Sequence, residues 1–98
     1  MGAREIVGDA PNQGAIQERF ATEGLEPHAW SNGPGDQYDW HSNRYGKLLY
    51  CVRGSIVFRI RGGGEHDLQA GDRLEIDAGT EHAADVGPDG VTCMEASR

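Results

Sequence analysis

The chain has 98 residues, enough for one small domain with a single hydrophobic core. Sixteen acidic residues against nine basic ones give a net charge of −7, which argues against binding to nucleic acids and to anionic membrane surfaces. No apolar stretch approaches the roughly eighteen residues that a transmembrane helix needs. Two cysteines, Cys51 and Cys93, do not make a disulfide framework, so we expect a reduced, cytoplasmic setting.

Residues 1–24 are expected to form an N-terminal extension with a short helix. Asp9 can cap this helix, and Pro11 suits its first turn. Ile16 and Phe20 then fall on one face of the helix. This face predicts a small lid that packs on the rest of the domain.

From residue 25 onward, short apolar runs alternate with turns that contain many of the fifteen glycines. This pattern is typical of an all-β sandwich or barrel. The predicted strands cover residues 26–31, 38–43, 47–52, 55–61, 65–68, 73–76, 82–86 and 91–96. We expect tight connections at Arg53-Gly54 and at Gly62-Gly63-Gly64.

Side chains alternate between the two faces of each predicted strand. If Lys47 points into the barrel, Leu49 and Cys51 do so too. Leu48 and Tyr50 would then lie on the outer face. An apolar outer face on a small barrel is usually covered, often by a second subunit, so we expect a homodimer.

Two spaced motifs contain the most informative residues. One covers residues 41–54 and reads His-x-Asn-x3-Lys-x6-Gly, and the other covers residues 71–82 and reads Gly-x5-Asp-x-Gly-x2-His. They resemble the two motifs of the cupin superfamily, His-x-His-x3-Glu-x6-Gly and Gly-x5-Pro-x-Gly-x2-His. The spacings agree without a gap. Three positions differ, because Asn43, Lys47 and Asp77 replace His, Glu and Pro.

The resemblance implies a double-stranded β-helix, the jelly-roll barrel of the cupins, over residues 25–98. In that family three histidines and one glutamate hold a divalent metal inside the barrel, which here would be Zn, Fe, Mn, Ni or Cu. His41 and His82 keep their identity as ligands, whereas Asn43 offers only a weakly coordinating amide oxygen. Lys47 brings an ammonium to the glutamate position, where it would repel a divalent cation.

These departures leave three functions open. The first is a small-molecule site at the barrel mouth, with or without a weakly held divalent metal on His41 and His82. As an enzyme, it would be a dioxygenase, isomerase or lyase acting on a small organic acid or sugar. The second is a metal-free module in which Lys47 holds an anionic ligand. The third is a structural cupin whose outer sheet pairs with a partner.

Lys47 is also the candidate catalytic residue, since an inward-facing lysine can serve as a base or a Schiff-base nucleophile. The plainer alternative is an ion pair with one of three acidic residues, Glu75, Glu81 or Glu95.

Several other side chains are expected near the barrel mouth or in the core. Four aromatic residues are expected either to line a small-molecule pocket near the mouth or to belong to the ordinary core: Trp30, Tyr38, Trp40 and Tyr45. His28 is expected to reach the mouth as well, whereas His66 is expected on the surface beside a turn. Both cysteines are expected to be buried thiols.

Overall fold

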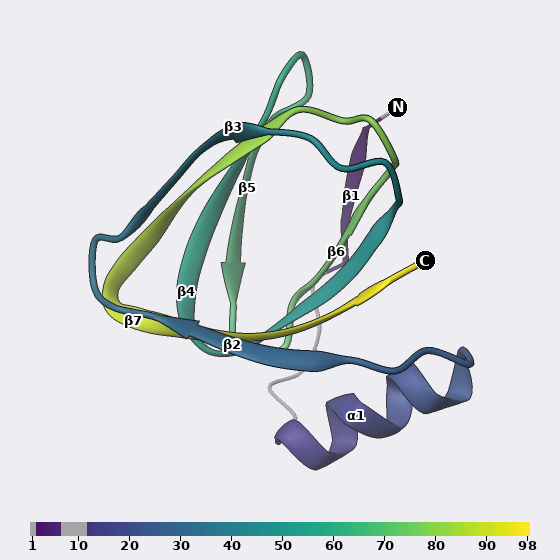
Figure 1. The fold of residues 1–98 in the computed structure, drawn as a ribbon. Coiled ribbons are helices and arrows are strands. Elements are labelled where there is room, and N and C mark those ends of the chain that lie inside the picture. The colour runs from purple at the N-terminus through teal and green to yellow at the C-terminus, as the bar shows by residue number, and fades with distance from the viewer. Residues whose placement is uncertain (1, 7–11) are drawn as a thin grey trace.

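In the computed structural model of the chain, which describes residues 2–6 and 12–98, all the described strands belong to one sheet that curls into an open barrel (Figure 1). The described elements are β1 (Ala3–Ile6), α1 (Gln13–Thr22), β2 (His28–Asn32), β3 (Gln37–His41), β4 (Lys47–Ile60), β5 (Gly64–Gln69), β6 (Arg73–Ile76) and β7 (His82–Ser97). The expected all-β barrel with a short N-terminal helix is confirmed. Within the described residues, no helix has the length and apolar character needed to cross a membrane.

Two long antiparallel strands, β4 and β7, organise the sheet, because they pair with each other along almost their whole length. The N-terminal part of β4 also pairs with β6, and the C-terminal part of β7 with β2. Their other parts pair with β5 and β3, respectively. The strand β1 adds to the far side of β6. The sheet therefore forms two layers connected by continuous strands, which is a jelly-roll arrangement.

Strand β4 bends at Gly54, where the sequence predicted a tight turn between two strands. Gly54 has a φ of +78°, and a Cβ atom built there would lie 2.1 Å from the carbonyl oxygen of Gly90 on β7. Register shifts lie on both sides of it. The predicted turn is wrong, because a bulge of this kind bends a strand without ending it. Residues 82–86 and 91–96 are likewise two parts of one strand.

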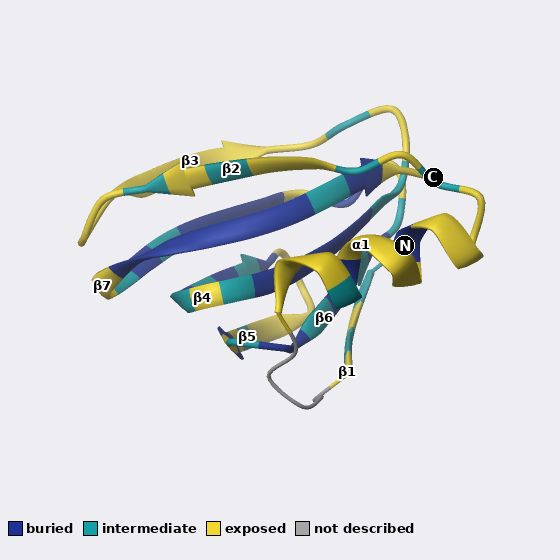
Figure 2. Ribbon diagram, turned by 90° about the horizontal axis from the view of Figure 1, so that it is seen from below, coloured by how far each residue is buried: buried dark blue, intermediate teal, exposed yellow. Residues whose placement is uncertain are grey.

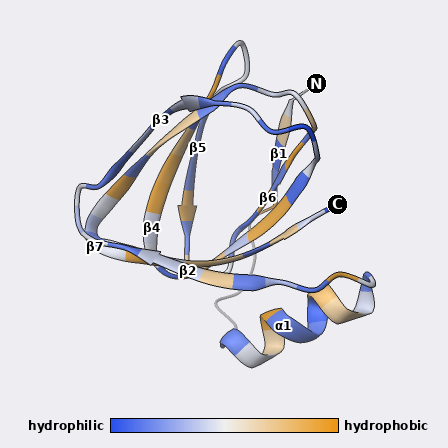
Figure 3. Ribbon diagram, in the orientation of Figure 1, coloured by the Kyte–Doolittle hydropathy of each residue, from blue (hydrophilic) through white to orange (hydrophobic). Residues whose placement is uncertain are grey.

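The inner core fills the space between the two layers. Its buried members are Leu49, Cys51, Ile56, Phe58, Ile60, Leu68, Leu74, Ile76, Ala84, Val86, Val91 and Cys93. Both cysteines belong to it, as predicted. Apolar residues recur along β4, whereas β3 is mostly hydrophilic and exposed along its length (Figures 2 and 3). Strand β3 therefore contributes little to this core and is free to present polar side chains.

A second apolar cluster lies outside the barrel, under helix α1. Ile16 and Phe20 are fully buried there against Leu48, Tyr50 and Met94. The Phe20 ring meets the Tyr50 ring edge-on, with 5.4 Å between the ring centroids. The outer face that sequence analysis assigned to a second subunit is thus covered by the chain's own helix. The homodimer stays a prediction, without this face as its support.

The helix begins with the N-cap Asn12, whose side-chain oxygen accepts a hydrogen bond from the backbone N–H of Ala15 at 2.9 Å. The cap predicted at Asp9 and the proline at Pro11 lie outside the described residues. The N-terminal extension also includes the strand β1, which the sequence analysis did not predict.

Asp77, which stands where the cupin motif has proline, fastens β1 to the barrel. Its carboxylate accepts a hydrogen bond from the Arg4 guanidinium at 3.0 Å, and this bond lowers the pKa of Asp77. Arg4 also pairs with Glu75 at 3.3 Å. Nearby, Glu5 of β1 lies 3.4 Å from His66, which is partly buried and not on the open surface as predicted.

Removing the Phe20 ring should destabilise the protein strongly, because the ring is fully buried between α1 and the sheet. We expect Phe20→Ala to lower the free energy of unfolding by about 3–5 kcal/mol in urea titrations. Gln17→Ala, on the exposed side of the same helix, should change it by less than about 0.5 kcal/mol. A loss below about 1 kcal/mol for Phe20→Ala would show that α1 does not hold this position in solution.

Candidate functional site

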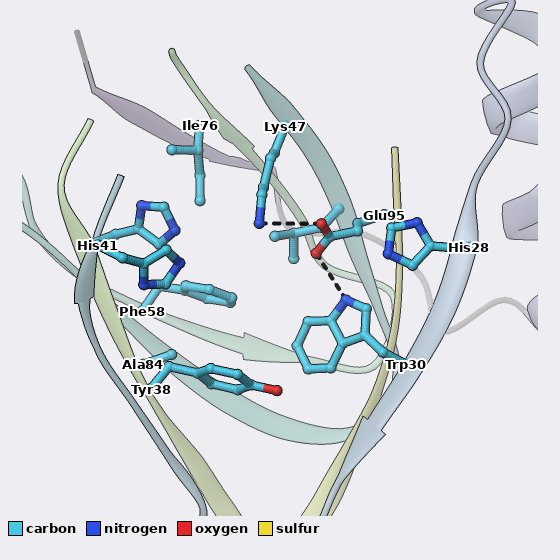
Figure 4. A pocket seen from close by; sticks show the side chains of 11 residues that line it. His28, Trp30, Tyr38, His41, Lys47, Phe58, Ile76, Ala84 and Glu95 are labelled. Carbon is cyan, nitrogen blue, oxygen red and sulfur yellow. Dashed lines mark hydrogen bonds and ion pairs between the residues drawn. The ribbon is translucent and has the colours of Figure 1, made fainter. Parts of the chain in front are cut away.

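A pocket of about 240 Å³ lies inside the barrel, with room for roughly eight water molecules at about 30 Å³ each (Figure 4). Its walls come from strands β2, β3, β4, β6 and β7. The lining residues are His28, Trp30, Tyr38, His41, Lys47, Leu49, Phe58, Ile76, His82, Ala84 and Glu95. The pocket therefore combines an apolar floor with a few polar side chains, as small-molecule sites do.

Two histidines meet at one wall of the pocket. His41 ends β3, His82 begins β7, and the two residues are direct partners in the antiparallel pairing. Their ring centroids are 4.3 Å apart, with the planes at 60°. His82 is almost fully buried, whereas His41 lies at the exposed rim. The structure thus brings together the two histidines that the motif spacings singled out.

Both imidazoles are held in the same way, by a carbonyl two residues earlier in the chain. The Nδ1 of His41 lies 2.8 Å from the carbonyl oxygen of Asp39, and the Nδ1 of His82 lies 2.9 Å from that of Thr80. A carbonyl oxygen can only accept, so Nδ1 carries the hydrogen in each ring. In the neutral ring Nε2 is then the acceptor. The pair therefore offers two acceptor nitrogens.

The buried histidine favours its neutral form. Burial lowers the pKa of His82 below the ordinary value, and the neighbouring His41 and Lys47 lower it further. The hydrogen bond to Thr80 and the charge of Glu95 act in the opposite direction without reversing the shift. His82 is therefore a neutral hydrogen-bond acceptor at neutral pH.

Lys47, at the start of β4, forms an ion pair inside the pocket. Its Nζ lies 3.2 Å from Oε2 of Glu95, and Oε1 of Glu95 accepts a hydrogen bond from the Trp30 indole at 2.8 Å (Figure 4). The Lys47 and Glu95 side chains are only 16% and 13% exposed. Of the three acidic partners considered for Lys47, the structure selects Glu95. Glu75 pairs instead with arginines, and Glu81 pairs with Arg61.

Some predicted site residues lie elsewhere. Asn43 is not among the residues that line the pocket; its carbonyl accepts a hydrogen bond from the Gly79 N–H at 2.8 Å. Trp40 and Tyr45 are 39% and 48% exposed and also lie outside the lining. The Arg61 guanidinium sits 4.3 Å from the Trp40 ring centroid. The expectation that these two aromatic residues gather at the mouth is wrong, whereas Trp30, Tyr38 and His28 do line the pocket.

Glu95 was only one of three acidic candidates for pairing with Lys47, although the sequence contained a signal that favours it. Cys93 and Glu95 share one face of their strand by alternation, so the prediction of a buried Cys93 already implied an inward Glu95. The structure places both on the inner side of β7, Glu95 in the pocket and Cys93 in the core.

The side chains present match the metal centre of the cupins only in part. Across residues 2–6 and 12–98, no group of three or more His, Cys, Asp or Glu side chains is arranged to hold a metal ion. His41 and His82 offer two nitrogens, but Lys47 adds a positive charge to the same pocket, and both oxygens of Glu95 already have partners. The four-ligand set is therefore not assembled, and a metal on the two histidines stays a prediction.

The His82 ring should titrate below the ordinary histidine value of about 6.5 in an NMR pH titration. Lys47→Met should move this titration to higher pH, because it removes a nearby positive charge and leaves Glu95 negative. In the wild type, His82 takes up a proton at higher pH in the unfolded chain than in the folded protein. The free energy of unfolding should therefore fall as the pH is lowered through about 6.5. A His82 pKa above that of an unfolded histidine would contradict the burial described here.

A protein-family model described as a cupin domain matches residues 21–90 of the chain. This range contains both histidines, Lys47 and the bend of β4. No curated protein matches the sequence.

Solved structures share the fold at low sequence identity. A structure of the DMSP lyases RdDddP and RnDddQII is 26% identical with a TM-score of 0.71, covering 76% of this chain and 38% of that chain. An RmlC-like cupin from Shewanella frigidimarina is 22% identical, with a TM-score of 0.66 and coverages of 74% and 64%. A DUF861 family protein from Thermotoga maritima is 10% identical, with a TM-score of 0.66, and the match covers 98% of this chain and 99% of that chain. The match to the lyase structure thus spans 38% of that chain's length.

Proposed function

The chain belongs to the cupin family, and we propose that its barrel binds a small organic anion through the Lys47 ammonium, without a metal. The observation that supports this most directly is the position of Lys47, which brings an ammonium, paired with Glu95, into a pocket where the family holds a cation. Two neutral-ring acceptor nitrogens, from His41 and His82, share that pocket.

The ammonium has hydrogen-bonding capacity left for a ligand. A lysine side chain has three N–H donors, and Glu95 engages Lys47 through one carboxylate oxygen. A ligand carboxylate can accept from the remaining donors. Hydrogen bonds between charged groups are stronger than neutral ones, and screening by water is weak in a largely buried pocket. An anionic head group is therefore the chemistry that Lys47 recognises.

The two histidines favour a ligand that also has hydrogen-bond donors. Because both rings present acceptors, they pair with groups that donate, and a hydroxyl group does so. The apolar side chains of Leu49, Phe58 and Ile76 provide contact for a short carbon skeleton. Together these requirements describe a small hydroxy acid or sugar acid.

Glu95 gives the site selectivity as well as structure. Its charge opposes the entry of a second anion, so a ligand must compete with it for Lys47. The indole of Trp30 keeps the carboxylate hydrogen-bonded when Lys47 turns to a ligand. The pair can therefore open without leaving a buried carboxylate with no partner, which would otherwise be costly.

A divalent metal held by His41 and His82 is the second candidate, supported by the 4.3 Å separation of the rings and by their Nε2 acceptors. Such a metal would supply Lewis-acid chemistry to a substrate oxygen. The remaining ligands would come from water or the bound molecule. With such a metal, the protein would be a dioxygenase, isomerase or lyase. The similarity to the structure of DMSP lyases supports this second candidate.

The anion proposal predicts which variants bind. In NMR titrations of the wild type with lactate, malate and gluconate, we expect at least one acid to shift the His82 ring and the Trp30 indole signals. Lys47→Met/Glu95→Gln should stay folded, since neutral groups replace a buried ion pair, but should bind that acid at least tenfold more weakly. Glu95→Gln alone should bind it more tightly, because the competing carboxylate is gone.

Melting temperatures of the three proteins provide the control for folding. The anion proposal would be wrong if the double variant bound the acid as well as the wild type does. It would also be wrong if none of the three acids bound the wild type or Glu95→Gln at millimolar concentration.

The two candidates differ in metal content. We expect untagged wild-type protein to contain no stoichiometric metal by elemental analysis and to melt at the same temperature with or without Zn, Ni, Mn or Fe. Lys47→Glu/Glu95→Gln places a carboxylate at the motif position and should acquire Zn binding, with a melting temperature raised by added Zn. Stoichiometric metal in the wild type, lost in His41→Ala and in His82→Ala, would instead establish the second candidate.

A further inference from the structure

The two cysteines of the chain face each other deep in the barrel. Cys51 on β4 and Cys93 on β7 are direct partners in the antiparallel pairing, and both are fully buried. The next pair on the same face is Leu49 opposite Glu95, and both of these residues line the pocket. The thiols therefore lie one step below the floor of the pocket, in a position that the proposed function does not use.

The backbone hydrogen bonds of Cys51 define the geometry of this pair. Its N–H donates to the carbonyl of Asp72 at 3.0 Å, and its carbonyl accepts from the N–H of Gly71 at 2.8 Å. Both groups thus point away from β7, which makes Cys51 and Cys93 a non-hydrogen-bonded pair. In such pairs the Cα atoms are about 4.5 Å apart and the side chains are at their closest. Disulfides bridge Cα atoms about 4.4–6.8 Å apart.

The side chains also point to the same side of the sheet. Cys51 and Cys93 belong to one cluster of the inner core. The interaction between the two thiols lowers the pKa of Cys51 and raises the pKa of Cys93, which burial raises further. The Cys51 thiol in turn donates to the carbonyl of Arg53 at 3.6 Å. Of the two thiols, Cys51 is the one whose pKa is lowered.

We propose that Cys51 and Cys93 are a redox pair that closes into a cross-strand disulfide when a peroxide reaches the core. The Cys51 thiolate attacks hydrogen peroxide and becomes a sulfenic acid, with release of hydroxide, which the thiol proton converts to water. The Cys93 sulfur then attacks the Cys51 sulfur, and the sulfenic hydroxyl leaves as a second water molecule. In total, two thiols and one peroxide give one disulfide and two waters. A small dithiol then reduces the disulfide to the two cysteine thiols and is itself oxidised to a cyclic disulfide.

The disulfide would connect the two strands that carry the pocket. It joins positions 42 apart in the sequence, and a cross-link over a loop of this length restricts the unfolded chain considerably. Cys93 is also the pairing partner of Trp30, which holds Glu95 in the pocket. Oxidation therefore fixes the register of β4 and β7 directly beneath the Lys47–Glu95 pair.

The test compares reduced and peroxide-treated protein under native conditions. We expect the intact mass to fall by two hydrogens, the thiol count in denaturant to fall from two to zero, and dithiothreitol to reverse both. The melting temperature should rise by about 10 °C or more on oxidation. Cys51→Ser and Cys93→Ser should each retain the remaining thiol or gain oxygen mass, with no increase in melting temperature.

Two results would overturn the inference. One is native protein that keeps both thiols in peroxide while the urea-unfolded chain oxidises, because the core would then be closed to the oxidant. The other is oxidation that yields only disulfide-linked dimers on a non-reducing gel. Either result leaves the anion proposal untouched, since that proposal does not involve the thiols.

Discussion

The close approach of Gly54 to Gly90 is the constraint on which the pocket depends. Lys47 and His82 start the two long strands, and because these strands are antiparallel they stand at opposite ends of the pair. In a straight sheet, thirteen steps of about 3.3 Å would put them roughly 40 Å apart. The bend at Gly54 folds the pair over, so both side chains reach one pocket. A side chain at Gly54 would collide with the backbone of β7 and open that bend.

Much of this architecture could be read from the chain. The motif spacings identified the histidine pair, and strand alternation placed Leu49 and Cys51 inside. The predicted tight turn at Gly54 was wrong, because a glycine with positive φ suits both a tight turn and a bulge within one strand. What distinguishes them is the carbonyl of Gly90, far away in the sequence. The sequence predicted that the helix packs on the domain, but it did not show that α1 covers the outer face, since that depends on where the helix docks.

The site was less predictable than the fold, because its chemistry depends on register. Three glutamates were possible partners for Lys47, and only the pairing of Leu49 with Glu95 decides among them. The substitution of Lys47 for the motif's glutamate pointed to altered chemistry but did not show where a carboxylate would reappear. In the structure it reappears on the neighbouring strand, with Trp30 as its second partner. The negative charge that this chain lacks at position 47 of β4 is thus supplied by Glu95 of β7.

The chain's two tryptophans report on different surroundings. Trp30 donates its indole N–H to Glu95 inside the pocket, while Trp40 stacks on arginine at the outer surface. With Trp40 replaced by phenylalanine, the tryptophan fluorescence comes from Trp30 alone, which is hydrogen-bonded to Glu95 of the ion pair. Any molecule that draws the lysine away from the carboxylate alters the electric field at that indole. The protein therefore carries its own optical probe of what enters the barrel.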